Sequence, residues 1–296
     1  MQKKLVERKL LVSVLMLALV SVACAREIKS NQGVMQKITG LKTPESVVQA
    51  KNGKIYVSEI NGFGKDGDGQ ITVIENGKPR VFATGLDDPK GLVIIGQNLY
   101  VADKSKVLKI NLANQGQGQA EVFAATSAFP ETPLFFNDLE ADISGNLYLS
   151  DTGDMKGKGG VVYKIDPQGI VTTVISNKQE QRVLGPNGLL MDDTGDVIMV
   201  VDFLSGILYS YNMKSHTLTN LAEGFGGGDG LVHHSSGKMF VSDWNNGKVF
   251  SIDLKGDVKE IKSGYKAAAD IALTQDERYL MVPDMKAGEL DFIPVN

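Results

Sequence analysis

Cysteine is nearly absent from this sequence, and the one that occurs, Cys24, lies at the end of an apolar run near the start of the chain. A disulfide within the folded chain is therefore excluded. Long basic runs are also missing and the formal net charge is −4, which argues against a nucleic-acid partner. Beyond residue 25, no segment keeps a helical apolar period for three turns. The sequence therefore favours a fold of many short strands, and the 33 glycines are typical of the tight turns that such a fold needs.

Residues 1–24 are predicted to be a signal peptide. The basic segment MQKKLVERK precedes an apolar stretch of 14 residues, which is short for a permanent membrane span. Ala23-Cys24-Ala25 fits ordinary signal peptidase, whereas Cys24 at the end of the apolar run fits a bacterial lipoprotein tethered through its lipidated cysteine. Residues 25–33 resemble a polar tether. We expect export to the periplasm or envelope, with free secretion as an alternative, and no disulfide in the mature protein.

One phrase occurs six times along residues 34–296. Each copy has an apolar run, a Gly- or Asn-rich turn, a strand that ends in an acid, an alternating strand and, in most copies, an outer strand. The terminal acids are Glu59, Asp103, Asp151, Asp202, Asp243 and Asp284, separated by 44, 48, 51, 41 and 41 residues. Four antiparallel strands repeated at this spacing predict a six-bladed β-propeller, an all-β fold.

Closure of the ring can also be predicted. The sixth copy ends at Asn296 after its third strand, while residues 34–39 form a spare strand ahead of the first copy. We expect residues 34–39 to pair beside residues 289–295 and to complete the last blade. A seven-bladed ring is the alternative architecture. Residues 124–136 are the one unassigned stretch long enough to suggest it, and they are too short for a blade.

The position at the start of each innermost strand differs from copy to copy. In chain order it holds Glu45, Lys90, Asn137, Asn187, Asp229 and, in the sixth copy, Ala269 or Asp270. Asn and Asp commonly precede strands because they hydrogen-bond the local backbone. A shared structural role, however, would require one residue type at every copy.

Four of these positions carry oxygen ligands that the ring would bring to one point. Two carboxylates (Glu45 and Asp229) and two amides (Asn137 and Asn187) form a hard donor set with two negative charges. Such a set predicts one axial divalent metal ion. Ca²⁺ fits best, with Mg²⁺, Mn²⁺ and Zn²⁺ as alternatives.

The phrases PNGLLMDDTGDVIMVVD, GDGLVHHSSGKMFVSD and FNDLEADISGNLYLSD, with an early PES, resemble the senescence marker protein/gluconolactonase/regucalcin family, whose rings are similar to those of diisopropylfluorophosphatase and the paraoxonases. The resemblance spans residues 34–296. It implies that Glu45, Asn187 and Asp229 hold the metal, and that Asn137 contacts substrate or metal. It also implies hydrolysis of a lactone or another ester, with Asp229 as general base or nucleophile.

Three departures from the family pattern affect the expected substrate. Phe135 stands where sugar-lactone members have an arginine, Glu45-Ser46-Val47 replaces Glu-Gly-Pro, and Lys90 adds a cation. We therefore expect a small-molecule lactone or ester contacted by Lys90, Phe135 and Asn137, for which a more apolar compound is an alternative at least equal to a sugar acid. The alternative is a non-catalytic binding platform, in which Lys90 would pair with Glu45 or Asp229 and take the place of the metal.

Four other motifs have simpler interpretations. His233 and His234 are adjacent, so on a strand they would face opposite ways. Residues 65–70 contain a fragment of a calcium-binding loop, although a hairpin loop explains them as well. Residues 224–230 are Gly-rich, but no helix is expected after them, so a phosphate loop is disfavoured. Trp244 and Asn245 follow a strand end, where packing of the blade would explain them.

Overall fold

The structure is a computed structural model that describes residues 35–113 and 116–295. The signal peptide predicted for residues 1–24, Cys24 itself, the tether of residues 25–33 and Val34 lie outside the described residues. In the described part of the chain, no helix is long and apolar enough to cross a membrane.

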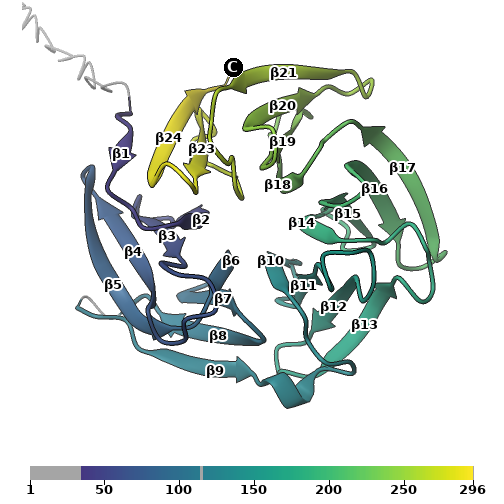
Figure 1. The fold of residues 1–296 in the computed structure, drawn as a ribbon, viewed down its shortest axis with the longest axis horizontal. Coiled ribbons are helices and arrows are strands. Elements are labelled where there is room, and N and C mark those ends of the chain that lie inside the picture. Colours follow the sequence, from purple (N-terminus) through teal and green to yellow (C-terminus); the bar gives the residue numbers. More distant parts are fainter. Residues whose placement is uncertain (1–34, 114–115, 296) are drawn as a thin grey trace, which may run out of the picture. The chain divides into compact units, whose positions relative to one another are not determined.

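The described residues form six four-stranded antiparallel sheets around a central axis (Figure 1). Blades one to three are β2 (Pro44–Gln49), β3 (Ile55–Glu59), β4 (Gly69–Glu75) and β5 (Lys78–Leu86); β6 (Pro89–Ile95), β7 (Asn98–Asp103), β8 (Lys106–Asn111) and β9 (Ala120–Ala124); and β10 (Phe136–Ala141), β11 (Leu147–Asp151), β12 (Val161–Ile165) and β13 (Val171–Ser176). Blades four to six are β14 (Pro186–Met191), β15 (Val197–Asp202), β16 (Ile207–Asn212) and β17 (Thr217–Glu223); β18 (Gly228–His233), β19 (Met239–Asp243), β20 (Lys248–Ile252) and β21 (Val258–Ser263); and β22 (Ala272–Leu273), β23 (Tyr279–Asp284), β24 (Glu289–Pro294) and β1 (Ile38–Thr39). The predicted six-bladed propeller is confirmed.

The ring closes as predicted, with β1 as the outer strand of the last blade. Ile38 pairs with Leu290 and Thr39 pairs with Glu289, both antiparallel. The backbone N–H of Leu41 then donates to the carbonyl of Gly288 at 3.0 Å. Among the described residues no seventh sheet is present, and the stretch that suggested one contains only a single 3-10 turn at Thr126–Ala128.

All six blades share one register at the axis. The first residue of each inner strand pairs with the terminal acid of the next strand, as in Pro44 with Glu59 and Pro186 with Asp202. In blade six the equivalent bridge joins Ala268 to Asp284. The axial residue is the one that follows, so the sixth axial residue is Ala269, not Asp270.

The terminal acids also hold the loops that lead into the inner strands. Asp202 Oδ2 accepts hydrogen bonds from the backbone N–H groups of Leu184 and Gly185 at 3.0 and 2.8 Å. Its Oδ1 accepts from Leu204 and Ser205 at 3.1 and 2.9 Å. Because these N–H groups have no strand partner, the carboxylate satisfies them and fixes where the inner strand begins.

Glycine follows several axial residues because neighbouring inner strands nearly touch there. A Cβ on Gly188 would lie 2.2 Å from the carbonyl oxygen of Asp229, and one on Gly230 would lie 2.3 Å from the nitrogen of Ile271. The Asn-Gly-Leu and Asp-Gly-Leu phrases therefore combine one axial side chain with one close contact between blades.

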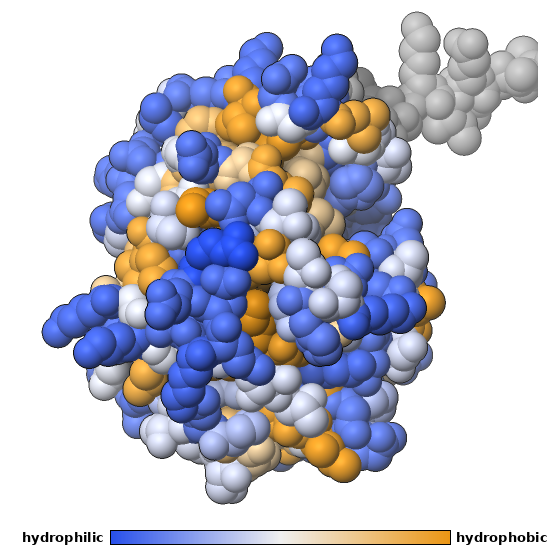
Figure 2. Space-filling view, turned by 90° about the vertical axis from the view of Figure 1, so that its right-hand side faces the viewer, coloured by the Kyte–Doolittle hydropathy of each residue, from blue (hydrophilic) through white to orange (hydrophobic). Residues whose placement is uncertain are grey.

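Apolar side chains fill the spaces between blades. Tyr56 and Phe82 of blade one, with ring centroids 5.3 Å apart, share a core with Leu99 and Val101 of blade two. On the outside, Figure 2 shows the side of the ring that carries β17, where hydrophilic residues mix with scattered apolar ones. The dense inter-blade cores hold the inner strands, and hence the axial side chains, in place.

Candidate functional site

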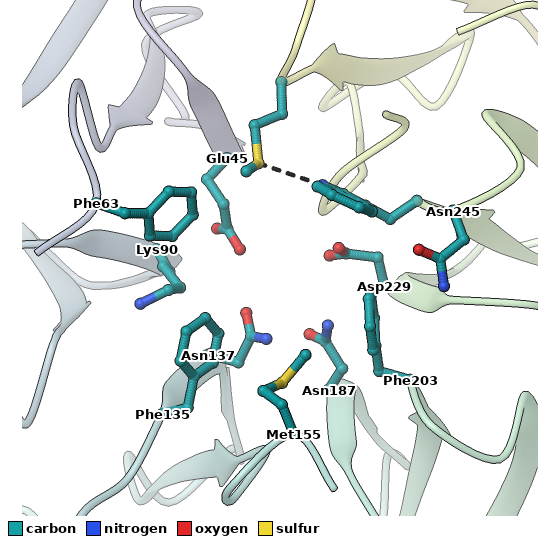
Figure 3. A pocket seen from close by; sticks show the side chains of 12 residues that line it. Glu45, Phe63, Lys90, Phe135, Asn137, Met155, Asn187, Phe203, Asp229 and Asn245 are labelled. Atoms are coloured by element: carbon teal, nitrogen blue, oxygen red, sulfur yellow. Dashed lines mark hydrogen bonds between the residues drawn. The ribbon is translucent and has the colours of Figure 1, made fainter. Parts of the chain in front are cut away.

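The axial residues come together at one end of the ring. Each of the first five is the second residue of its inner strand and is almost fully buried, with exposed fractions of 1–6%. Figure 3 shows the side-chain oxygens of four of them turned toward a common centre. These four are Glu45, Asn137, Asn187 and Asp229. The structure thus brings together the residues that were predicted to share a site.

Three of the converging oxygens lack a hydrogen-bond partner. Glu45 Oε2, Asn187 Oδ1 and Asp229 Oδ1 are buried, and none of them contacts a donor within the described part of the chain. Buried oxygens are normally hydrogen-bonded, so three unsatisfied ones from three blades need an explanation. A cation at their centre would satisfy all three at once.

Asn137 is oriented by a residue that the sequence analysis did not identify. Its Nδ2 donates to Thr152 Oγ1 at 3.1 Å, and the Thr152 hydroxyl donates to the carbonyl of Pro186 at 3.0 Å. The amide nitrogen is therefore held at the side of the ring, which leaves Asn137 Oδ1 to face the axis (Figure 3).

Both axial carboxylates are disfavoured as anions without a counter-charge. Burial raises the pKa of Glu45 well above its usual range, and the charges of Asp229 and Asp270 raise it further, while Lys90 lowers it. Burial likewise raises the pKa of Asp229, with added contributions from Asp270 and Asp243. A divalent cation would reverse both effects by stabilising the ionised forms.

The donor set suits a hard cation. In the described residues, no group of three or more His, Cys, Asp or Glu side chains lies close enough to hold a metal ion. The ring instead offers two carboxylates and two amide oxygens, which favours Ca²⁺ over softer metals that need nitrogen or sulfur ligands. The unsatisfied oxygens and their chemistry fit the predicted metal.

Lys90 lies in the ring but does not occupy its centre. Its Nζ stands 4.4 Å from the centroid of the Phe135 ring and donates to the backbone carbonyl of Asp88 at 3.4 Å. Within the described residues it forms no ion pair with a carboxylate at 4.0 Å or less. Burial lowers the pKa of Lys90, against the opposing charges of Glu45 and Asp88. The alternative in which this ammonium pairs with Glu45 or Asp229 in place of the metal is therefore not what the structure shows.

Above the polar ring the cavity has apolar walls. It encloses about 450 Å³, and its walls are formed by Phe63, Phe135, Met155, Phe203, Trp244 and Met285. Trp244 Nε1 donates to Met285 Sδ at 3.3 Å, and Phe203 meets Trp244 edge-on at 6.2 Å. Phe135 thus lines the site as predicted, whereas Trp244 and Asn245 border the cavity in addition to any packing role.

The sequence did carry a signal for most of the wall. Thr152, Phe203, Trp244 and Met285 each come directly after a terminal acid, in blades three to six. Phe63 and Met155 follow the acids of blades one and three by four residues. Alignment of the repeats one residue beyond the acids would have placed these side chains at the same end of the ring.

A second polar layer lies directly after the axial residues in the chain. Asp138 Oδ2 accepts from the backbone N–H of Leu189 at 2.7 Å, and Asp270 Oδ2 accepts from Ser46 Oγ at 2.5 Å. Burial raises the pKa of Asp270 to about 7. Because both carboxylates have hydrogen-bond donors, they join adjacent blades and are not candidates for the metal.

The two histidines and the loop before β4 do not border this site. His233 ends β18, and His234 follows it in a turn, where Nδ1 contacts Ser236 Oγ at 2.8 Å. Neither histidine borders the axial cavity. Residues 65–68 belong to the connection from β3 to β4, which begins at Gly69. Residues 224–227 precede β18, whose first three residues complete the Gly-rich motif and carry Asp229 to the axis, and no helix follows.

Comparison with known proteins identifies the family of this chain and a solved structure with the same fold. The protein is a six-bladed β-propeller whose axis carries buried carboxylate and amide oxygens at one end. The family described as "SMP-30/Gluconolactonase/LRE-like region" matches residues 43–283, and the chain belongs to this family. A search of curated protein sequences found no match. A solved structure titled "Streptogramin B lyase structure" has a TM-score of 0.60 at 9% identity and covers 87% of this chain and 97% of that one, which shows a shared fold.

Proposed function

We propose that this protein is a divalent-metal-dependent hydrolase that opens a lactone or cleaves a related ester. The observation that carries the proposal is the set of three buried, unsatisfied oxygens on Glu45, Asn187 and Asp229, which face one centre beneath an apolar cavity. Family membership supports a hydrolase or lyase class of chemistry. Export, with Cys24 as a lipid anchor, is part of the same proposal and depends on residues 1–24 alone.

The axial residues would have two roles, metal binding and proton transfer. Glu45, Asn187 and Asp229, with Asn137, would hold the ion, which when bound would polarise the substrate carbonyl. Asp229 would accept a proton from a water molecule as its oxygen attacks the carbonyl carbon. The bond between that carbon and the ester oxygen then breaks, and the proton passes from Asp229 to the departing oxygen, which leaves a carboxylic acid and an alcohol.

The walls favour an apolar substrate. Phenylalanine, methionine and tryptophan side chains surround the space above the ring, and a sugar would leave many hydroxyls without partners there. We therefore propose an aryl or alkyl lactone or ester as the substrate class.

Calorimetry and turnover test the proposal together. Chelator-treated protein should bind one Ca²⁺, and the loaded protein should hydrolyse members of a panel of aryl esters and apolar lactones. Glu45→Gln should weaken Ca²⁺ binding at least tenfold, because one of two anionic ligands is lost. Asp229→Asn should lower kcat at least 100-fold even at saturating Ca²⁺, because an amide cannot accept the proton.

Thr172→Val, on the exposed face of β13, is a matched control that should change neither quantity. Absence of binding at millimolar Ca²⁺, Mg²⁺ and Mn²⁺, together with no turnover, would refute the hydrolase proposal and favour a binding platform.

A further inference from the structure

The ammonium of Lys90 is an incompletely satisfied cation that borders the cavity. Lys90 is 2% exposed, and within residues 35–113 and 116–295 only one of its three N–H donors has an acceptor, the Asp88 carbonyl at the long distance of 3.4 Å. Contact with the Phe135 ring compensates part of the cost of burial. A buried charge with so few partners is costly unless a counter-ion completes it.

Charge balance within the cavity supports this reading. Glu45, Lys90 and Asp229 are the charged side chains that line it within the described residues. A divalent ion would neutralise the two carboxylates, and the loaded site would then keep the positive charge of Lys90. A ligand with one negative charge would make the site neutral.

The direction of the side chain shows which part of a ligand it would meet. Figure 3 shows Lys90 Nζ pointing away from the centre where the oxygens converge, on the side of Phe63 and Phe135. A carbonyl bound at the centre would therefore lie apart from the ammonium. The partner of Lys90 would be a substituent of the ligand that lies against the aromatic wall.

We propose that Lys90 binds a carboxylate that the substrate carries away from its scissile ester bond. The substrate class is then an apolar lactone or ester with an acidic substituent, an inference that rests on the proposed hydrolase function. A carboxylate suits the site better than a phosphate, because one cation and apolar walls would leave most oxygens of a phosphate dianion unsatisfied.

A pair of unreactive probes tests this inference without turnover. Phenylsuccinate carries two carboxylates, one for the axial ion and one for Lys90, and its monoamide carries only one. Their binding to Ca²⁺-loaded protein would be measured by calorimetry. We expect phenylsuccinate to bind at least tenfold more tightly than the monoamide, because a charge-assisted hydrogen bond to a buried ammonium is lost in the latter.

Two variants locate the effect. Lys90→Met removes the charge but keeps an unbranched apolar side chain, one atom shorter, beside Phe135, and should bind the two probes equally. Lys286→Met is the matched control: Lys286 also stands over an aromatic ring, 3.9 Å from the Trp244 centroid, but is exposed and does not line the cavity. This control should keep the tenfold preference.

Equal binding of the two probes by the unsubstituted protein would overturn the inference, and that comparison needs no variant to fold. A preference that persists in Lys90→Met would overturn it as well. If the preference requires Lys90 but no ester is hydrolysed, the carboxylate site stands and the proposed reaction fails. If esters are hydrolysed without any preference, only the carboxylate site fails.

Discussion

At the scale of single residues, the hydroxyl of Thr152 decides which end of Asn137 faces the axis. It accepts from the amide nitrogen of its own blade and donates to the Pro186 carbonyl of the next blade, so both of its hydrogen-bonding roles are fixed. An amide without this partner could turn its nitrogen toward the centre, where it would repel a cation.

Thr152→Val should therefore weaken Ca²⁺ binding about tenfold while the fold is kept, because valine has the same shape but no hydroxyl. Calorimetry on chelator-treated protein measures the change, with Thr172→Val as the control. Unchanged affinity in Thr152→Val would show that Asn137 is not a ligand or is oriented by another contact.

A pH dependence of stability follows from Glu140. Burial raises the pKa of this carboxyl to about 7, and the charge of Asp270 contributes to the shift. Between about pH 4.5 and pH 7 the unfolded chain loses the proton while the folded chain keeps it, so stability falls as pH rises through this window. Above pH 7 the carboxylate is ionised in both states, and the folded protein bears the full free-energy cost of burying its charge.

Glu140→Gln should remove this cost. We compare the free energy of unfolding of the variant with that of the unsubstituted protein at each pH. Because Glu140 is partly exposed, this difference should be about 1 kcal/mol more favourable to the variant at pH 8 than at pH 4.5. Urea unfolding of metal-free protein at both pH values gives the difference, and Glu121→Gln on the outer strand β9 should show no gain. A loss of stability at pH 8 would contradict the prediction.

At the scale of the strand, consecutive residues of each inner strand have separate tasks. In β14, Asn187 faces the axis while Gly188 packs against the backbone of β18. The close approach depends on the missing side chain, since a methyl group there would overlap the carbonyl oxygen of Asp229.

Gly188→Ala should thus lower the free energy of unfolding by about 2 kcal/mol and should also weaken Ca²⁺ binding, because β18 must move together with Asp229. Urea unfolding and calorimetry measure the two effects. Gly116→Ala, where a Cβ would meet nothing within 4 Å, should change stability by less than about 0.5 kcal/mol. Equal effects of the two substitutions would argue against the close packing.

The repeated phrase was sufficient to predict the inner strands and the four converging side chains, because a fixed register places equivalent residues at equivalent points of the ring. The sixth position stayed ambiguous, since only the bridge between Ala268 and Asp284 reveals the register there. The direction of Lys90 could not be predicted, because a long flexible chain is positioned by Phe135 and by the Asp88 carbonyl. Thr152 was missed because its role depends on a hydrogen bond to the Pro186 carbonyl of the next blade, which the sequence does not reveal.

At the scale of the whole ring, closure depends on a very short strand. β1 contributes two paired residues to the last blade, and the buried side chain of Ile38 packs with Leu290 in the core shared by blades six and one. The ion pair between Lys37 and Glu289, at 2.9 Å, is exposed and should contribute little.

A chain that begins at Leu41 should be less stable than one that begins at Met35 by about 2–3 kcal/mol, the value of one buried aliphatic side chain with its strand pairing. Thermal and urea unfolding test this, and Lys37→Ala in the longer chain should have an effect below about 1 kcal/mol. Equal stability of the two chains would show that β1 does not hold the ring closed.

The division of tasks along each inner strand has a consequence for how such rings diverge. In β14 the side-chain oxygen of Asn187 faces the axis without a partner among the described residues, whereas Gly188 provides the close approach to β18. The axial side chain of one blade can therefore be substituted, and the chemistry of the site changed, while the packing of the inner strands is kept. Ala269 is the one of the six axial residues without a polar side chain. Substitution of Ala269 by Asp or Asn, in evolution or by design, would add a further oxygen ligand to the site.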